Sequence, residues 1–533
     1  MNDLGNRRPT VLLIGPYDPH CGEYTFLAPP LGVWRLAGVL ESSGAHVRVF
    51  DPNCCTISPQ RALERELLQC PWDVIGVSTT GMTLKFDLEL AYIARRVAPD
   101  ALLVAGGMEA TFRPDLMFEL GPFDLVVLGE GERPLTEIVR RLRAGEALDA
   151  VAGTAARVDG AIVRRTQPAL TREELRAAIF SIPYERMPYP AYWSRLEQAY
   201  RVGQLPSKAH REARLAEIRS VRLITLNYCP MGCTFCSATN FLRESQGHVA
   251  PVARLEADEC LTMIEHIVAA HPGVRTIIFQ DDIFTFTQDR RLLPLCQAIL
   301  AAKKRGALPR GLQFISTNRI DAMSVERLAA MRSAGFRVLG FGIESFSPRV
   351  LAEFNKAQIH RHIEPVLSTA LDLGITPFLD LILSSPRATL DDLGETLRQA
   401  YRWLRRGCEI GMYPYVIPFS GAAFARDRSL APHTTHARRR VAGTHIEWDQ
   451  PAKILPIDPA VREAVLRIES AFESRLAALE EGVAHLPSRV RSLIWILSSL
   501  SVLADCGIEV ADAHEVEAEL DARLPRVNGV TAL

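Results

Sequence analysis

Three cysteines lie close together in the stretch LNYCPMGCTFC, at Cys229, Cys233 and Cys236. Three thiolates on one short loop can ligate three irons of a [4Fe–4S] cubane and leave the fourth iron open, as a catalytic metal site requires. With 11 cysteines in 533 residues, this spacing would arise by chance with a likelihood of about 0.005. A structural zinc site would need a fourth ligand nearby, and no other cysteine or histidine lies between Ser220 and Gly247. The spacing therefore predicts an iron–sulfur cluster.

The cysteine loop follows the first of six short apolar segments that alternate with helical patterns. The predicted strands are Arg222–Asn227, Arg275–Gln280, Leu312–Ser316, Val338–Ile343, Pro377–Leu383 and Ile410–Val416. Helical spacing of apolar residues over Ala257–Ala270 and Val325–Ala334 is typical of the intervening helices. Six strand–helix units predict a partial (β/α)6 barrel over residues 220–420. The carboxyl ends of barrel strands are where such folds place their chemistry.

Residues 1–150 show a second alternating series, which predicts a doubly wound parallel sheet of the Rossmann-like class. Its short apolar strands are predicted at Val11–Gly15, Val47–Asp51, Val74–Ser78, Leu102–Gly106 and Leu125–Leu128. Such a sheet binds its ligand at the carboxyl ends of its strands. Small and acidic residues gather there, namely Ser78, Thr79, Gly106, Gly107, Gly129, Glu130 and Gly131. The stretch GPYDPHCGEY after the first strand does not match the dinucleotide-binding pattern Gly-x-Gly-x-x-Gly.

The rest of the chain carries weaker signals. Residues 151–219 are predicted to form a connector that packs against both neighbours, and residues 421–533 a helical C-terminal domain. Tyr413, Tyr415 and Phe419 are candidates for shaping a substrate pocket together with this helical region. The stretch Leu493–Ala504 is too short to span a bilayer. No signal-peptide pattern is present at the N-terminus, so we expect a cytoplasmic protein without a membrane span.

The net charge is balanced, with 61 lysines and arginines against 62 aspartates and glutamates. This balance does not favour a nucleic-acid partner, because a protein that binds a phosphate backbone usually carries a positive surplus. We therefore expect a small-molecule substrate.

Polar residues at the barrel's predicted strand ends extend the pattern of the cysteine loop. They are Asp281 and Asp282 after the second strand, Ser316 and Arg319 at the third, and Glu344 and Ser345 in GIES after the fourth. Together with Phe235, just before the third cysteine, these features resemble the radical S-adenosylmethionine (SAM) superfamily. The resemblance implies that SAM chelates the open iron and is cleaved to a 5′-deoxyadenosyl radical. It also implies SAM contacts at these strand ends and an electron donor such as flavodoxin or ferredoxin.

The N-terminal series resembles the cobalamin-binding domain that many radical SAM enzymes carry. The matching stretches are APPLGVWRLAGVLESSGAHVRVFD, DVIGVSTT, LLVAGGMEAT and DLVVLGEGE. The resemblance implies that cobalamin lies over the strand ends that contain Ser78, Gly106 and Gly129. The family's cobalt-ligating pattern is Asp-x-His-x-x-Gly, whereas here glycine follows His20 one place early. His20 is therefore not assigned as a cobalt ligand.

A second departure concerns the barrel's glycine-rich motif, which resembles Gly-x-Ile-x-Gly-x-Pro in the family. In LDLILSSPRATLDD, Pro386 is kept, but Ser384 and Ser385 stand where glycine is expected. Because glycine allows close approach to a ligand, this departure puts the adenine contact at the motif in doubt.

The two resemblances together favour a cobalamin-dependent methylation of an unactivated carbon. The first alternative is a cobalamin radical SAM enzyme that cyclises or rearranges its substrate. A methylthiotransferase is a weaker alternative, because Cys21, Cys54, Cys55 and Cys70 lack the spacing of its second cluster. A non-catalytic cobalamin-binding module is disfavoured by the intact cysteine triad. No residue chooses among a lipid, a tetrapyrrole and another natural-product substrate.

Overall fold

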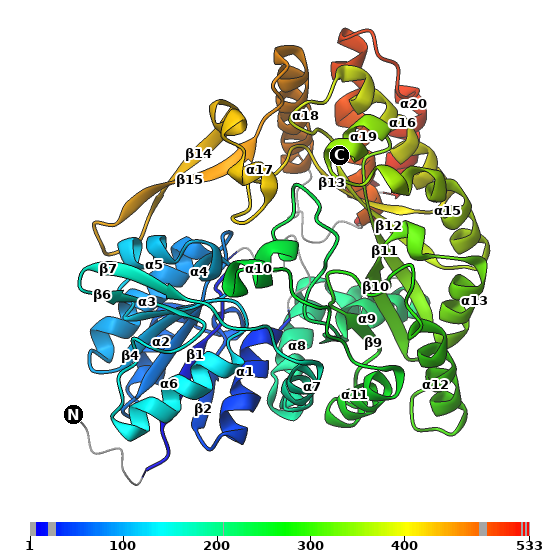
Figure 1. The fold of residues 1–533 in the computed structure, drawn as a ribbon. Helices are drawn as coiled ribbons and strands as arrows, with labels where there is room; N and C mark the ends of the chain where they lie inside the picture. Colours follow the sequence, from blue (N-terminus) through cyan, green and yellow to red (C-terminus); the bar gives the residue numbers. More distant parts are fainter. Residues whose placement is uncertain are drawn as a thin grey trace.

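A computed structural model describes residues 7–19, 28–205, 207–478 and 488–523, together with two short strands near the C-terminus, β16 (Arg526–Val527) and β17 (Val530–Thr531). The chain forms two α/β units side by side, with a helical region beyond the second unit (Figure 1).

The N-terminal unit is a seven-stranded sheet in the order β2-β1-β3-β4-β5-β6-β7. Its first five strands are parallel. They are β1 (Thr10–Ile14), β2 (His46–Phe50), β3 (Val74–Ser78), β4 (Leu102–Gly106) and β5 (Leu125–Val127). Neighbouring residues along a strand contact opposite layers: Leu12 and Ile14 pack into one apolar core and Val11 and Leu13 into another. This burial on both faces explains why these strands appear as unbroken apolar runs.

Helices cover both faces of this sheet. The helices α1 (Leu31–Ser42) and α6 (Glu132–Ala144) bury their apolar stripes in one core, and α2 (Pro59–Leu67), α3 (Leu84–Val97) and α5 (Pro114–Leu120) bury theirs in the other. The short helix α4 (Met108–Phe112) begins directly behind β4. The doubly wound sheet expected from the sequence is confirmed.

The sheet continues beyond residue 150, where the sequence analysis predicted a connector. Strands β6 (Thr154–Val158) and β7 (Ala161–Arg165) extend it as an antiparallel hairpin. The turn between them is Asp159–Gly160, and both residues have positive φ angles, 50° and 80°. An Asp-Gly pair between two short strands is a strong hairpin signal, because both positions of this tight turn require positive φ. The parallel sheet predicted for residues 1–150 is observed, and the two added strands lie in the segment that was predicted to be a connector.

The rest of the connector forms three helices, α7 (Arg172–Phe180), α8 (Tyr189–Ala199) and α9 (Lys208–Ile218). The Tyr192 hydroxyl donates a 2.7 Å hydrogen bond to Asp51, at the end of β2. The Tyr184 hydroxyl donates a 2.9 Å bond to the carbonyl of Arg222 in the second unit. The segment therefore packs against both of its neighbours, as the sequence analysis predicted.

The second unit is a six-stranded parallel sheet in the sequential order β8 to β13. The strands are β8 (Ser220–Leu223), β9 (Thr276–Phe279), β10 (Gln313–Asn318), β11 (Phe336–Glu344), β12 (Thr376–Ile382) and β13 (Glu409–Tyr413). The connecting helices are α10 (Phe241–Gln246), α11 (Ala257–Ala270), α12 (Leu292–Lys304), α13 (Val325–Ala334), α14 (Pro348–Glu353), α15 (Ile363–Asp372) and α16 (Leu390–Arg406). Within the described strands, β13 and β8 do not pair. The barrel is therefore partial, as predicted.

The C-terminal region is mainly helical, with α17 (Ala423–Arg426), α18 (Pro459–Ala477), α19 (Ser488–Asp505) and α20 (Ala513–Arg523). Phe472 of α18 stacks on Trp495 of α19, with ring centroids 3.7 Å apart. No described helix is both long and apolar enough to cross a membrane.

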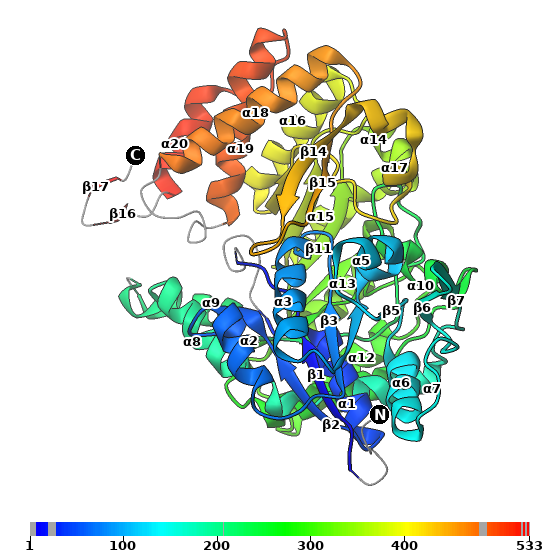
Figure 2. The same ribbon diagram turned by 90° about the vertical axis from the view of Figure 1, so that its left-hand side faces the viewer.

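The sequence analysis missed the antiparallel hairpin of β14 (Thr434–Arg440) and β15 (Glu447–Ile454) in this region. Figures 1 and 2 show it extending from the barrel side to the N-terminal unit. The strand sequence TTHARRR is almost without apolar residues. It therefore lacks the alternation by which a half-buried strand is detected.

Candidate functional site

The cysteine loop lies at the carboxyl edge of the barrel, after β8, and is fastened to the end of α14 and the residues just after it. The Asn355 side chain donates a 3.0 Å hydrogen bond to the carbonyl of Gly232, which has a φ of +70°. The Thr234 hydroxyl donates a 2.9 Å bond to the carbonyl of Glu353. Because Gly232 lies between two of the three cysteines, these bonds set the path of the loop that carries the thiols.

The thiols of Cys229, Cys233 and Cys236 are free and partly buried. Burial raises the pKa of Cys229 to about 12 and also raises the pKa of Cys233 and Cys236. The charge of the Cys233 thiolate adds to the rise in pKa at both other cysteines, so the three thiols lie near one another. A bound cation would reverse this shift, because a metal-coordinated thiol is deprotonated.

This set of sulfur donors fits the three protein ligands of a cubane cluster. Among the described residues, no three potential ligands stand close enough together to hold a single metal ion. The cluster ligation therefore rests on the spacing and the common surroundings of the thiols.

Glu344 and Lys356 form a buried ion pair beside this loop. The Lys356 ammonium donates to Glu344 Oε1 at 2.6 Å and to the carbonyl of Gly342 at 3.0 Å. Burial acts to lower the pKa of Lys356, but the Glu344 carboxylate and Cys233 outweigh it and raise the pKa. Glu344 has a φ of 64°, a strained conformation for a residue with a side chain, and such strain clusters at functional sites. The ammonium also lies 5.6 Å from the ring centroid of Phe235, so it connects Glu344 to the cysteine loop.

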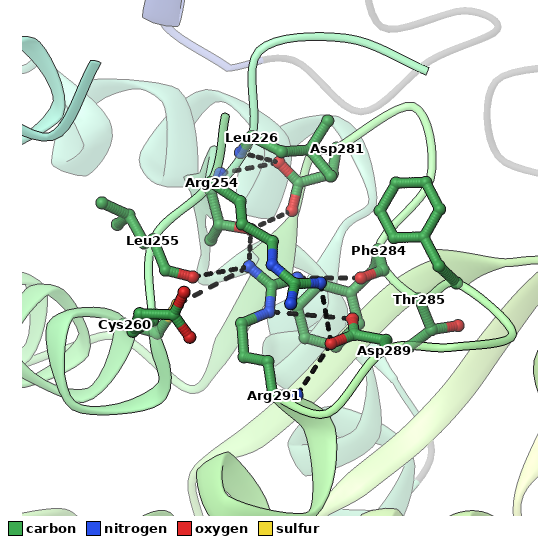
Figure 3. Close-up of polar contacts among 12 residues, drawn as sticks. Leu226, Arg254, Leu255, Cys260, Asp281, Phe284, Thr285, Asp289 and Arg291 are labelled. Atoms are coloured by element: carbon green, nitrogen blue, oxygen red, sulfur yellow. Dashed lines mark hydrogen bonds and ion pairs between the residues drawn. The ribbon is translucent and has the colours of Figure 1, made fainter. Parts of the chain in front are cut away.

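Asp281 is buried and fully engaged with the protein, as Figure 3 shows. Its Oδ1 accepts from the backbone N–H groups of Thr225 and Leu226 at 2.6 and 3.1 Å, and its Oδ2 accepts from the Thr225 hydroxyl at 2.5 Å. Buried Arg291 donates to the same hydroxyl at 2.8 Å and to the carbonyl of Phe284. These contacts hold Asp281 at the entrance to the cysteine loop, and the SAM contact suggested by the sequence stays a prediction.

The next residue, Asp282, is the one that faces the cysteines. Its side chain is accessible to solvent. Desolvation raises the pKa of Asp282, and its charge in turn helps to raise the pKa of Cys229 and Cys236. Because protein donors already occupy both oxygens of Asp281, we favour Asp282 of the two aspartates as the candidate for a SAM contact.

Three other candidates make internal contacts. Arg319 forms a two-pronged ion pair with Asp321, at 2.8 and 2.7 Å. Ser316 is buried and accepts from Asn318 at 3.0 Å, and Ser345 is buried against the Thr396 hydroxyl at 2.9 Å. Arg319 lies close enough to Cys233 and Cys229 for their charges to help raise its pKa. It therefore borders the cysteine loop, and the SAM contacts of Ser316 and Ser345 stay predictions.

Asp380 on β12 was missed by the sequence analysis. Burial, followed by the nearby Glu344 carboxylate, raises the pKa of Asp380 to about 7. The residue stands where the family's Gly-x-Ile-x-Gly-x-Pro motif would have its first glycine, and this mismatch is the signal that could have found it. Later in the motif, Ser384 donates to the carbonyl of Pro414 at 2.7 Å, and the next residue, Ser385, donates to Glu353.

A cavity of about 450 Å³ lies at the carboxyl edge of the N-terminal sheet. Of the predicted residues there, Ser78, Gly106, Gly107, Gly129, Glu130 and Gly131 line it. Thr79 does not; its hydroxyl donates to the carbonyl of Gly106 at 2.9 Å. A side chain at Gly107 would place its Cβ 2.5 Å from the carbonyl oxygen of Thr79, and Gly107 has a φ of +96°. Glycine is therefore required at this edge of the cavity.

Among the described residues that line this cavity, Glu130 is the one acidic group. Its Oε2 accepts from the backbone of Leu170 at 2.8 Å, while Oε1 is buried without a hydrogen-bond partner among the described residues. Burial, followed by the charge of Glu132, raises the pKa of Glu130 to about 7. A largely apolar cavity with one unsatisfied carboxyl oxygen fits a large neutral cofactor rich in amide groups. His20 and Cys21 lie outside the described residues.

A second cavity, of about 410 Å³, lies between the N-terminal unit, the cysteine loop and the β14–β15 hairpin. Its walls include Thr80 and Met108 from the strand ends of the sheet, and Ser237, the neighbour of Cys236. Tyr415 and Phe419 line it as the sequence analysis proposed for a substrate pocket. Tyr413 does not line it and is half-exposed instead.

Family comparisons agree with this architecture. The model of the B12-binding domain matches residues 19–139, and that of the radical SAM superfamily matches residues 223–400. The chain therefore contains a B12-binding domain followed by a radical SAM domain. Its cofactors are accordingly a [4Fe–4S] cluster, SAM and cobalamin. Both resemblances inferred from the sequence are confirmed.

Three known proteins illustrate the similarity. An uncharacterized methyltransferase, PH0819, of Pyrococcus horikoshii is 26% identical over 70% of this chain and 73% of its own length. The anaerobic magnesium-protoporphyrin IX monomethyl ester cyclase of Cereibacter sphaeroides is 25% identical over 70% of this chain and 56% of its own. The cobalamin-dependent SAM radical enzyme OxsB shares the fold with a TM-score of 0.63 at 16% identity, over 97% of this chain and 82% of that structure.

Proposed function

We propose that this radical SAM enzyme transfers a methyl group from SAM to an unactivated carbon of a small molecule bound between the B12-binding domain and the barrel. The observation that carries the proposal is the cavity of about 410 Å³ that contacts both Met108, beside the strand ends of the B12-binding domain, and Ser237, beside Cys236. A substrate in this cavity would be within reach of both cofactor sites. The similarity to the methyltransferase of Pyrococcus horikoshii supports the same reaction class.

When bound, the cluster with SAM supplies a hydrogen-abstracting radical and cobalamin supplies a transferable methyl group. The residues of the chain hold the cofactor-binding loops in position and shield the cavity from solvent. Asn355 and Thr234 hold the cysteine loop, and the Glu344–Lys356 pair fixes the adjoining strand end. The hairpin β14–β15 forms one wall of the cavity and so limits the access of solvent to the reacting groups.

The remaining strand-end residues have proposed roles toward SAM and cobalamin. Asp282, Arg319 and Glu344 border the cysteine loop and can bind the amino and carboxylate groups of SAM through charge-assisted hydrogen bonds. At the other site, Glu130 Oε1 can meet an amide of cobalamin, because it is otherwise unpaired among the described residues.

A second candidate function is cyclisation or rearrangement without methyl transfer. The similarity to the cyclase of Cereibacter sphaeroides favours it, although this chain spans about half the length of that protein. Both reactions would consume SAM at the cluster, but only methylation also converts SAM to S-adenosylhomocysteine.

The decisive experiment measures the two SAM products by mass spectrometry. Protein purified without oxygen would be reconstituted with iron, sulfide and hydroxocobalamin, and then mixed with SAM and dithionite. We expect both 5′-deoxyadenosine and S-adenosylhomocysteine. Cys229→Ala should abolish 5′-deoxyadenosine, whereas Cys506→Ala, at an exposed cysteine outside the site, should not. 5′-Deoxyadenosine alone would favour the cyclase alternative, and the absence of both products would refute the proposal.

We further infer a cytoplasmic location and a protein electron donor such as flavodoxin or ferredoxin. The described cysteines are all unpaired, as expected in a reducing compartment, and reductive cleavage of SAM requires an electron from outside the chain. Reduced flavodoxin in place of dithionite should also yield 5′-deoxyadenosine.

A further inference from the structure

The β14–β15 hairpin is fixed to the B12-binding domain although it belongs to the C-terminal region (Figure 2). Trp448 and Val441 are buried in the apolar core of that domain. The Gln450 side chain donates a 2.5 Å hydrogen bond to the carbonyl of Gly81, and the backbone of Ala442 donates to Glu89 at 3.3 Å. These contacts hold the hairpin in place as one wall of the cavity between the domains.

Two neighbouring arginines of β14 have opposite surroundings. Arg438 forms ion pairs with Glu447 and Asp449, at 3.0 and 3.2 Å. Arg439 lies opposite Trp448 in the strand register, on the face that is turned to the B12-binding domain, and it lines the cavity of about 410 Å³. Along a strand, successive side chains point to opposite faces. Within the described part of the chain, Arg439 has neither an ion pair nor a hydrogen bond, so its charge is available to a ligand.

The rest of the cavity wall has a surplus of positive charge on a largely apolar surface. Arg113 and Lys453 line it together with Arg439, and of the lining residues that the structure describes, Glu109 is the acidic one. Lys453 is paired with Glu469 at 2.8 Å, and Arg113 lies 3.7 Å from Glu109. Burial raises the pKa of Glu109 and so favours its neutral form. The apolar part of the wall is formed by Met82, Met108, Phe112, Ile417, Pro418 and Phe419.

An adjoining cavity of about 480 Å³ is also lined by cationic side chains. It shares Phe112 and Arg113 with the first cavity and adds three further arginines, Arg164, Arg426 and Arg428, and two carboxylates, Glu244 and Asp427. Cationic groups therefore continue from the inner cavity to its neighbour.

We propose that the cavity between the domains binds a substrate with an apolar body and an acid group, a carboxylate or a phosphate ester, which pairs with Arg439 and Arg113. A guanidinium matches the two oxygens of such a group in a two-pronged hydrogen bond, and the apolar wall takes up the body of the molecule. That this molecule is the one methylated rests on the proposed function, whereas its binding does not.

The test measures binding by isothermal titration calorimetry to the anaerobic protein loaded with cluster and cobalamin. The probes are 1-naphthoate, 1-naphthyl phosphate and the neutral 1-naphthamide. We expect at least one acid to bind about fivefold or more tightly than the amide, as a charge-assisted bond would give. The tighter of the two acids identifies the acid group.

Substitutions of single arginines test which side chains bind the acid group. Arg439→Gln should weaken binding of the preferred acid by roughly five- to twentyfold and leave the amide unchanged. Arg113→Gln should weaken acid binding in the same direction, and Arg439→Lys should retain part of it, because a lysine keeps the charge but not the fork. Arg438→Gln is the matched control, one residue away on the opposite face, and should bind the acid like the unchanged protein. Unaltered cobalamin and cluster absorbance would verify that each variant is intact.

Equal binding of the acids and the amide would overturn the proposal, as would equal losses in Arg439→Gln and Arg438→Gln. So would the failure of all three probes to bind. Because binding is measured without turnover, the acid-binding site and methyl transfer can be refuted independently. Arg439-dependent acid binding without formation of S-adenosylhomocysteine would refute methyl transfer and leave the acid site standing.

Discussion

The hydroxyl of Thr225 donates a 2.5 Å hydrogen bond to Asp281, whose two oxygens bind the chain just ahead of the cysteine loop. Arg291 donates to the same hydroxyl from beneath, and Figure 3 shows it surrounded by its partners. A buried arginine and aspartate thus fix the point where β8 gives way to the cluster-binding loop. The position of the thiols depends on a network that none of the three cysteines belongs to.

Asp281→Asn should destabilise the protein and lower its cluster content. The amide cannot accept from all three donors, and an unsatisfied buried donor costs about 1–3 kcal/mol. We expect less iron bound per chain after anaerobic reconstitution, together with an unfolding midpoint at lower urea. Asp282→Asn is the control, because Asp282 makes none of these bonds; it should keep both iron and stability. Full iron content in Asp281→Asn would contradict the positioning role.

Lys356→Met should lower the free energy of unfolding by about 3–5 kcal/mol, because it leaves the buried Glu344 carboxylate unpaired. The double variant Glu344→Gln/Lys356→Met removes both charges and should recover much of this loss. Urea titration of Lys356→Met, Glu344→Gln and the double variant measures the coupling energy between the two side chains. Additive losses would mean that the two side chains do not interact, contrary to their 2.6 Å contact.

Asp87 should make stability fall as the pH rises. Burial raises the pKa of Asp87 to about 8, far above that of an exposed aspartate. The folded state therefore holds its proton while the unfolded chain releases it, and the stabilisation present below about pH 4 is lost as the pH rises toward 8. Asp87→Asn should flatten this part of the curve, as followed by urea unfolding between pH 5 and 8. Parallel curves for the two proteins would exclude Asp87 as the titrating group.

Cobalamin affinity should decline as the pH rises through about 7, near the pKa of Glu130. A cofactor that covers the carboxyl group favours its neutral form, because burying an unpaired charge is costly. Glu130→Gln is neutral at every pH and should bind cobalamin with little dependence on pH. Spectrophotometric titration with hydroxocobalamin between pH 6 and 8.5 would measure this. If both proteins show the same pH dependence, Glu130 does not meet the cofactor.

The sequence by itself determined the two α/β units and the cluster motif. Strands β3 and β4 were predicted at their observed limits, Val74–Ser78 and Leu102–Gly106. Apolar runs buried on both faces, and glycines at strand ends, are local properties that the chain shows directly. The spacing of Cys229, Cys233 and Cys236 is equally local.

Only the tertiary structure decided which polar residues remain available for ligands. Asp281 and Asp282 are neighbours in the sequence, yet the first is held by Thr225 and the second faces the cysteines. The hairpin carrying Arg439 could not be recognised from TTHARRR, because its stabilising contacts come from residues more than three hundred positions earlier. Hydrogen-bond partners and burial depend on which distant segments meet, and no local pattern records that.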